Sequence, residues 1–189
     1  RGLRRGAIET LILGLASDSV KHLLIKGPCC VLDKVDVYRS LETLSAQGEP
    51  KCGSLACEGM LSLKRLEIHL GPFRVTNLRL PPQLEVLRIN GRCSCTWLME
   101  VVAACSVSLR HLSLTQSAFL KRDSTLKFHC PALESLELIK CVGLEELTVC
   151  APLCRSVRLD DDVDLESLTI DSHALEELHI DSLLSLNNL

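Results

Sequence analysis

Aromatic side chains are scarce in this chain of 189 residues, because Phe, Trp and Tyr together make up only 3% of it. A sandwich packed around large aromatic side chains is therefore not expected. The apolar content is still 47%, and leucine is the commonest apolar residue, which favours a core of stacked short strands. The net charge of −3 argues against general nucleic-acid binding.

The chain also lacks the signals of secretion and of membrane insertion. No apolar run approaches the length of a membrane span. The chain starts RGLRRG, and its first apolar stretch, residues 8–15, carries Glu9, so no secretory signal is expected. The 11 cysteines are an odd number without a framework spacing. We therefore expect reduced core cysteines in a cytoplasmic or nuclear protein that has no membrane partner.

Motifs of catalysis and of phosphate binding are missing as well. The sequence contains no GxSxG, no GxGxxG and no GxxxxGK. Nucleophilic catalysis needs a nucleophile, a base and an orienting group, and six histidines with many serines produce such pairs by chance. We expect no enzymatic activity and no cofactor. An enzyme with an unrecognised site remains an alternative.

The close cysteine pairs do not have the spacing of a zinc site. They are Cys52 with Cys57, Cys93 with Cys95, and Cys150 with Cys154. Zinc fingers need two matched pairs, or one pair followed by histidines. The acidic run 160–164 fails as a calcium loop, since Leu165 and Asp171 occupy the positions of the required Gly and Glu. We expect no metal here, and a solvated acidic turn over this run.

The feature that is present is a repeated phrase: an apolar residue, two others, an apolar residue, one other, and an apolar residue. Its clearest copies are Leu133/Leu136/Leu138, Leu144/Leu147/Val149, Leu165/Leu168/Ile170 and Leu175/Leu178/Ile180. The last two apolar positions alternate with polar ones, as in a strand with one buried face. Copies follow every ten or eleven residues, so two of them make a period of about 21 residues, which predicts a solenoid.

Extended to the whole chain, the copies form two interleaved series. The first series starts at residues 20, 41, 63, 84, 109, 133, about 154, and 175, and the second at 8, 32, 75, 144, 165 and 186. We therefore predict an α/β leucine-rich-repeat solenoid over residues 1–189, β-dominated, with about eight coils of 21–25 residues. The first series forms a parallel concave sheet, and the second forms a convex side of short strands and loops.

Three local expectations refine this solenoid. Residues 96–105 have helical spacing behind Thr96 as N-cap, so a short convex helix is expected there. Residues 48–59 are expected to be a loop or a degraded convex segment. The loose copy Val157/Leu159, counted from Leu153, breaks the register by one residue and predicts a bulge. Cys141 and Ser117 follow the last strand leucine by three residues and are expected to bond to backbone inside their turns.

The candidate binding residues are those that flank the middle leucine of each concave strand or follow the strand. They are Arg65, Glu67, Arg88, Asn90, His111, Ser113, Glu137, Glu177, His179 and Asp181, with Val86, Ser135, His69 and Thr115 in equivalent places. Charge is unevenly distributed along the chain: residues 1–127 carry a net charge of +7 and residues 128–189 a net charge of −10. We expect a protein ligand on this surface, oriented by the charge gradient. Solvation of a leucine-rich tail is the other explanation of the acids.

The segment from Cys130 to Leu153 has a further pattern. It runs Cys130-Pro131-Ala132-Leu133-Glu134, then Leu136-x-Leu138, Cys141, Gly143-Leu144-Glu145-Glu146-Leu147 and Ala151-Pro152-Leu153. This residue pattern resembles the repeats of plant F-box/leucine-rich-repeat proteins, including those with an FBD tail. Residues 4–13, RRGAIETLIL, resemble the strand-like entry that follows the F-box in that family.

The resemblance implies a substrate-recognition region of a cullin-type ubiquitin ligase receptor. No F-box is recognised in this chain, so the ligase adaptor would be bound only by an F-box outside it. The alternative is the ligand-sensing repeat region of an intracellular plant immune receptor of the nucleotide-binding type.

Overall fold

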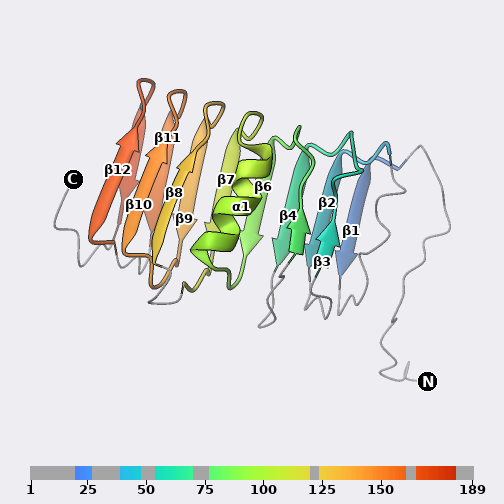
Figure 1. Ribbon diagram of the computed structural model, residues 1–189, viewed down its shortest axis with the longest axis horizontal. Helices are drawn as coiled ribbons and strands as arrows, with labels where there is room; N and C mark the ends of the chain where they lie inside the picture. Colours follow the sequence, from blue (N-terminus) through green and yellow to red (C-terminus); the bar gives the residue numbers. More distant parts are fainter. Residues whose placement is uncertain are drawn as a thin grey trace, which may run out of the picture.

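The computed structural model describes residues 20–26, 39–47, 54–69, 77–119, 124–160 and 165–181. These residues form a β-dominated solenoid of parallel strands in two layers, with one helix (Figure 1). Several expectations lie outside the described residues: the copies of the phrase at 8–13, 32–37 and 186–189, and residues 161–164 of the acidic run.

The first layer is a sheet of eight parallel strands. In sheet order they are β1 (His22–Lys26), β2 (Thr43–Gln47), β4 (Arg65–His69), β6 (Val86–Asn90), β7 (His111–Thr115), β9 (Ser135–Ile139), β11 (Ser156–Asp160) and β13 (Glu177–Ile180). Each strand begins two residues after a start of the first series, so the predicted assignment of that series to one continuous parallel sheet is confirmed. Pairing is in register along the whole sheet, for example Leu66 with Leu87 and Leu87 with Leu112.

The second layer holds the returning half of each coil. It contains β3 (Ser54–Ala56) paired with β5 (Asn77–Arg79), then α1 (Cys95–Cys105), then β8 (Thr125–His129), β10 (Glu146–Cys150) and β12 (Ser167–Asp171) in a second small sheet. About six turns can thus be followed through both layers within the described residues, against about eight coils predicted for the full chain. The segment 48–59, expected as a loop or degraded convex element, includes strand β3.

Helix α1 occupies the second layer between β5 and β8, where the coil is longest. The predicted helix is confirmed, but its predicted N-cap, Thr96, is wrong. Ser94 caps the helix, because its side-chain oxygen accepts a hydrogen bond from the Trp97 N–H at 3.2 Å. Leu98, Val102 and neighbouring apolar residues of the helix are buried. A helix advances 1.5 Å per residue against about 3.3 Å for a strand, so it needs more chain to cross the same coil.

The core is a stack of leucine-rich rows between the two layers. The second and fourth residues of the main strands point inward: Leu66, Leu87, Leu112 and Leu136 are at most 1% exposed. Burying a leucine side chain contributes roughly 1.5–3 kcal/mol, so each coil adds a similar increment to stability. Successive coils repeat these contacts, and the stack extends without needing large aromatic side chains.

Strand β11 contradicts the predicted bulge near residue 154. Val157 pairs with Leu136 and Leu159 pairs with Leu138, in unbroken register. Cys154, which is fully buried, is the first apolar residue of this copy, whereas Leu153 is 55% exposed. The prediction failed because the copy was counted from the leucine rather than from the cysteine beside it, although a buried thiol packs as a small apolar group.

The turn residues behave as structural groups. The Cys141 thiol lies 3.6 Å from the carbonyl oxygen of Leu114 and 3.8 Å from that of Ile139, and it is fully buried. Ser117 is fully buried too, and its backbone carbonyl accepts a hydrogen bond from the Val142 N–H. The expectation that the side chain bonds to backbone inside the turn is confirmed for Cys141 and is wrong for Ser117, whose buried hydroxyl oxygen has no hydrogen-bond partner.

Alternating charges precede the strands of the main sheet, and we call this row the charge ladder. It consists of Lys21, Glu42, Lys64, Glu85, Arg110, Glu134, Arg155 and Glu176, one residue before each strand. Side chains pair in doublets: Lys21 with Glu42 at 2.9 Å, Lys64 with Glu85 at 3.8 Å, Arg110 with Glu134 at 2.7 Å, and Arg155 with Glu176 at 3.8 Å. Every member from Glu42 onward also donates its N–H to the carbonyl oxygen of the preceding member.

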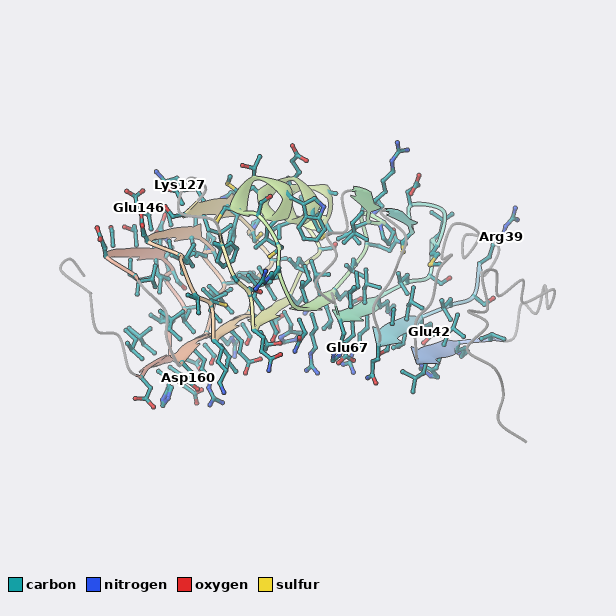
Figure 2. All side chains as sticks on the ribbon, turned by 90° about the horizontal axis from the view of Figure 1, so that it is seen from below. Arg39, Glu42, Glu67, Lys127, Glu146 and Asp160 are labelled. Atoms are coloured by element: carbon teal, nitrogen blue, oxygen red, sulfur yellow. The ribbon has the colours of Figure 1, made fainter. Side chains whose placement is uncertain are left out.

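Seen along the strands, the main sheet bows gently, and its outer face lies on the inside of the curve (Figure 2). Glu67 and Asp160 lie on this face, whereas Lys127 and Glu146 lie on the opposite layer (Figure 2). Within the described part of the chain, no helix combines the length and the apolar character needed to cross a bilayer.

Candidate functional site

The outer face of the eight-stranded sheet is the candidate site. The first, third and fifth residues of each strand point away from the core, and the parallel register brings equivalent positions of neighbouring strands side by side. The central row runs from Glu67 through Arg88, Ser113, Glu137 and Arg158 to His179. Neighbouring strands lie about 4.8 Å apart, so the row is a regular array of polar groups.

All ten predicted site residues lie on this face or at its edge. Arg65 and Glu67 belong to β4, Arg88 and Asn90 to β6, His111 and Ser113 to β7, Glu137 to β9, and Glu177 and His179 to β13, with Asp181 just after β13. Each is exposed or half-buried. Val86, an equivalent position that was also expected to face solvent, is instead buried, with 9% of its surface exposed.

Carboxylates on this face are held by hydroxyl groups of the preceding strand. Ser113 donates to Glu137 at 2.8 Å, Ser156 to Glu177 at 3.4 Å, and Ser45 to Glu67 at 3.4 Å. Such bonds restrict the rotamers of the acids, which lowers the conformational entropy that binding would cost. The face therefore presents its carboxylates in preferred orientations.

The cationic side chains near the middle of the face are not held by such hydrogen bonds. Among the described residues, the side chains of Arg65 and Arg88 are exposed and take part in no hydrogen bond or ion pair. Towards β13 the balance reverses, because Glu137, Asp160 and Glu177 lie on or beside the last three strands. Unpaired cations over β4 and β6 and acids towards β13 make the charge uneven along the solenoid axis.

None of the ten predicted site residues lies in β1, β2 or β11. Ser45 of β2 and Arg158 and Asp160 of β11 point to the same surface. In the copy that contains β2, the last apolar position is Ala46. In the copy that contains β11, the first apolar position is Cys154. Neither residue is leucine. Reading alanine and cysteine as apolar positions would have drawn candidates from β2 and β11.

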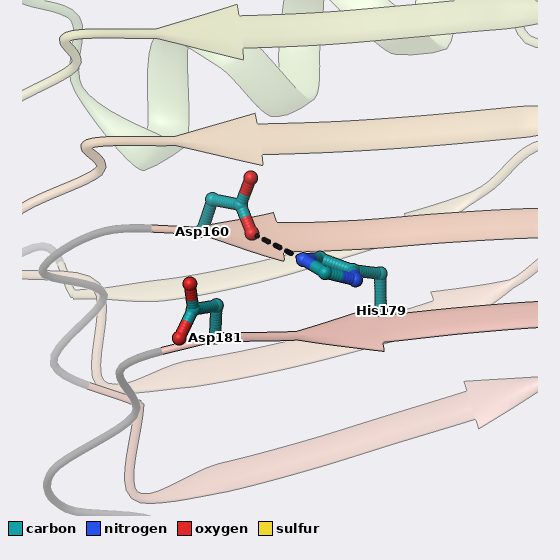
Figure 3. A group of neighbouring side chains, drawn as sticks. All are labelled: Asp160, His179 and Asp181. Carbon is teal, nitrogen blue, oxygen red and sulfur yellow. Dashed lines mark ion pairs between the residues drawn. The ribbon is translucent and has the colours of Figure 1, made fainter.

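Asp160 differs most from its prediction. It was expected in a solvated acidic turn, but it is the last residue of β11 and only 6% exposed. Its Oδ2 accepts a hydrogen bond from Arg158 Nε at 2.6 Å, and its Oδ1 lies 3.0 Å from His179 Nε2. Figure 3 shows Asp160 and His179 facing each other across adjacent strands, with Asp181 beside them. These three residues form the one group of potential metal ligands found among the described residues.

Four of the buried cysteines have thiols that resist ionisation. Burial raises the pKa of Cys57, Cys105, Cys130 and Cys141 to about 12. Their thiols therefore stay protonated at neutral pH, whereas the thiolate is the reactive species. Cys150 and Cys154, a pair with short spacing, have different surroundings: Cys150 approaches Asp171 Oδ2 at 3.6 Å, and the buried Cys154 approaches the Ser156 carbonyl at 3.5 Å.

The two layers, the register and the repeated polar rows define a parallel-sheet solenoid repeat protein. Comparisons with protein-family models, with curated proteins and with solved structures find no match.

Proposed function

We propose that this chain is a protein–protein interaction module that binds a protein partner on the outer face of its eight-stranded sheet. The observation that carries the proposal is the in-register row from Glu67 to His179, in which exposed polar side chains recur once per coil. A rigid array of this kind lets many weak contacts add without ordering a flexible loop.

The charges on the face suggest which partner surface it fits. Arg65 and Arg88 leave unpaired cations near the middle, and the acids gather towards β13. A partner with acidic groups over β4 and β6 and basic groups over β9 to β13 would complement this order. Complementary fields raise the association rate and fix the orientation of the complex.

The finer assignment is that the chain is the leucine-rich-repeat, substrate-recognition region of an F-box-type ubiquitin ligase subunit, acting in the cytoplasm or nucleus. It rests on the Cys-Pro, Cys and Ala-Pro pattern between Cys130 and Leu153 and on a repeat of 21–25 residues. Such a receptor does no bond chemistry. It raises the effective concentration of its substrate beside the ligase, while an adaptor binds an F-box outside this chain.

Photo-crosslinking from defined positions tests the interaction surface. A photoreactive residue is placed at Arg88 on the outer face, and the matched control carries it at Lys127 on the opposite layer. We expect a discrete crosslinked protein from position 88 that position 127 does not give. Equal crosslinking from both positions would remove the case for this face.

The crosslinked partner then allows a quantitative test of charge. Glu177 and Glu146 are matched acids on opposite layers, because each accepts from a hydroxyl group 21 residues earlier: Ser156 at 3.4 Å and Thr125 at 3.3 Å. Glu177→Lys should weaken binding by roughly tenfold, an effect that declines with salt, and Glu146→Lys should leave binding unchanged. A complex that is insensitive to Glu177→Lys contradicts the electrostatic part of the proposal.

The ligase role is tested separately by pull-down of the full-length parent protein. Co-purification of a cullin-type ligase adaptor supports it. A parent protein that instead carries a nucleotide-binding domain favours the immune-receptor alternative.

A further inference from the structure

Asp160, His179 and Asp181 meet at one edge of the outer face. Asp160 ends β11, His179 lies in β13, and Asp181 directly follows β13. Strands β11 and β13 are hydrogen-bonded neighbours, and the Asp181 N–H bonds to the carbonyl oxygen of Leu159. One ligand atom from each of the three side chains lies within 4.8 Å of the other two (Figure 3).

The Asp160 carboxylate is the buried centre of this group. Its side chain is only 9% exposed, and Arg158 bonds its Oδ2 through Nε and forms an ion pair with it through the guanidinium. Its Oδ1 is fully shielded from solvent and accepts no hydrogen bond. Arg158 therefore holds the carboxylate in one orientation and leaves Oδ1 directed at His179.

The contact between Asp160 Oδ1 and His179 Nε2 lacks the geometry of a hydrogen bond, although the atoms are 3.0 Å apart. In the tautomer whose proton is on Nδ1, the imidazole Nε2 carries a lone pair, as the carboxylate oxygen does, and a cation held by both atoms would bring them together at this distance. Metal–ligand bonds of about 2.1 Å place adjacent octahedral ligands about 3 Å apart and opposite ligands about 4.2 Å apart. The 3.0 Å between Asp160 Oδ1 and His179 Nε2 is the spacing of adjacent ligands, and a ligand atom of Asp181 lies within 4.8 Å of those of the other two residues.

We propose that Asp160, His179 and Asp181 bind a divalent first-row transition-metal ion. One imidazole and two carboxylates suit Zn²⁺ or Mn²⁺, whereas Ca²⁺ and Mg²⁺ prefer oxygen ligands alone. Arg158 supplies the outer hydrogen bonds that ligating carboxylates generally have, and His179 supplies the nitrogen. The two carboxylates and the Arg158 guanidinium have a combined charge of −1. A divalent ion would change this charge to +1, so we expect moderate affinity.

The site would join the last two strands of the described sheet. Leu178, an inward-facing residue of β13, is 46% exposed, so this strand has less packing than the strands before it. An ion that bridges β11 and β13 adds contacts between coils that the core does not supply here. This inference is independent of the proposed partner binding.

Titration of the purified, reduced chain with Mn²⁺ and with Zn²⁺ tests the site. We expect saturable binding of one ion per chain. The His179→Ala and Asp160→Asn variants should each lose at least tenfold in affinity, as losses of ligands and their supports do. Two matched control variants should bind the ion as tightly as the unsubstituted chain does. They are His111→Ala, which changes an exposed histidine of the same face, and Glu177→Gln, which changes an exposed acid of the same strand.

Co²⁺ as a probe separates this site from the cysteines. Co²⁺ bound by nitrogen and oxygen ligands should give weak absorption bands in the visible range. It should not give the intense near-ultraviolet absorption of Co²⁺ bound by thiolates. Circular dichroism checks each variant for folding, and His179→Ala carries the test if Asp160→Asn unfolds, since the His179 side chain is 61% exposed. Absence of saturable binding, thiolate-type absorption, or unchanged affinity in His179→Ala would overturn the proposal.

Discussion

Arg110 and Glu134 lie on adjacent coils, each one residue before a strand of the main sheet, and their side chains form an ion pair of 2.7 Å. The pair belongs to the charge ladder, in which every cation after Lys21 stands between acids of the coils on either side. Exposed pairs of this kind contribute about 0.2–1 kcal/mol each, and their arrangement also opposes a slip of one coil against the next.

The charge ladder predicts that Arg110→Glu destabilises the fold. This change places three acids in succession, at positions 85, 110 and 134, and should lower the free energy of unfolding by about 1 kcal/mol more than Arg110→Ala does. Urea unfolding at low and high salt measures the difference, which should shrink with salt.

A charge swap distinguishes a ladder from an isolated pair. Combining Arg110→Glu with Glu134→Arg restores the pair but leaves acids together at 85 and 110 and bases together at 134 and 155. We expect only partial recovery of stability. Full recovery would mean that the pair acts alone.

The lowered pKa of Glu42 predicts a loss of stability at acidic pH. A hydrogen bond from Lys21, and then the charge of Lys21, lower the pKa of Glu42 from its ordinary value of 4.5. Because the folded-state pKa is lowered, the pair stabilises the fold fully above about pH 4.5, and the contribution is lost as the pH falls through the lowered pKa.

Titration of the Glu42 carboxyl carbon by NMR measures this pKa. Lys21→Ala should raise it towards 4.5, and Arg110→Ala, a change in a distant doublet, should leave it in place. A Glu42 pKa that does not respond to Lys21→Ala contradicts the assignment of the ion pair.

The buried thiols predict a loss of stability in alkali. Burial raises the pKa of Cys105 from 9.0 to about 12. A raised folded-state pKa means that the stability contribution is complete below about pH 9 and is lost as the pH rises from 9 towards 12. Each such thiol steepens the decline by up to about 1.4 kcal/mol per pH unit.

Urea unfolding at pH 8, 9 and 10 measures the slope. Cys105→Ala should flatten it, and Cys150→Ala, which removes a half-buried thiol, should flatten it less. Equal slopes in the parent chain and in Cys105→Ala would show that the thiol ionises as readily in the folded chain as in the unfolded chain.

A left-handed backbone position follows three of the main strands. Gly91, Gln116 and Lys140 come directly after β6, β7 and β9, with φ of 122°, 53° and 55°. Glycine adopts such angles without a steric penalty, whereas other residues pay about 1 kcal/mol. Gly91→Ala should therefore lower the free energy of unfolding by about 1 kcal/mol, and Gln116→Gly should raise it by up to about 1 kcal/mol.

Ser106→Gly serves as the control for this pair, because Ser106 has an ordinary right-handed φ of −56°. Glycine there should destabilise the chain through the greater entropy of its unfolded state. If Gln116→Gly destabilises as much as Ser106→Gly does, the steric account of this position is wrong.

Much of the architecture was predictable from the sequence. The spacing of apolar residues located all eight strands of the main sheet, because alternation of period two assigns one face of each strand to the core. The helix near 96–105 was predictable for a similar reason, since its buried residues recur at helical spacing. The same alternation placed the ten candidate residues on or at the edge of one face.

The misses share a physical cause. Cys154 and Ala46 fill apolar positions with small side chains, and a pattern based on large aliphatic residues does not register them. The charge ladder is present in the sequence as an alternation of sign, but its period spans two coils, and only the strand boundaries show which residues are equivalent.

By itself, the sequence determined the repeat length, the layer to which each segment belongs and the face that each strand residue takes, because these follow from local periodicity. Only the tertiary structure decided which charges meet. The approach of Asp160 to His179 depends on the register of two strands and on the orientation that Arg158 imposes on a carboxylate. Such contacts join residues about 20 positions apart, so only the packing of one coil on the next brings them together.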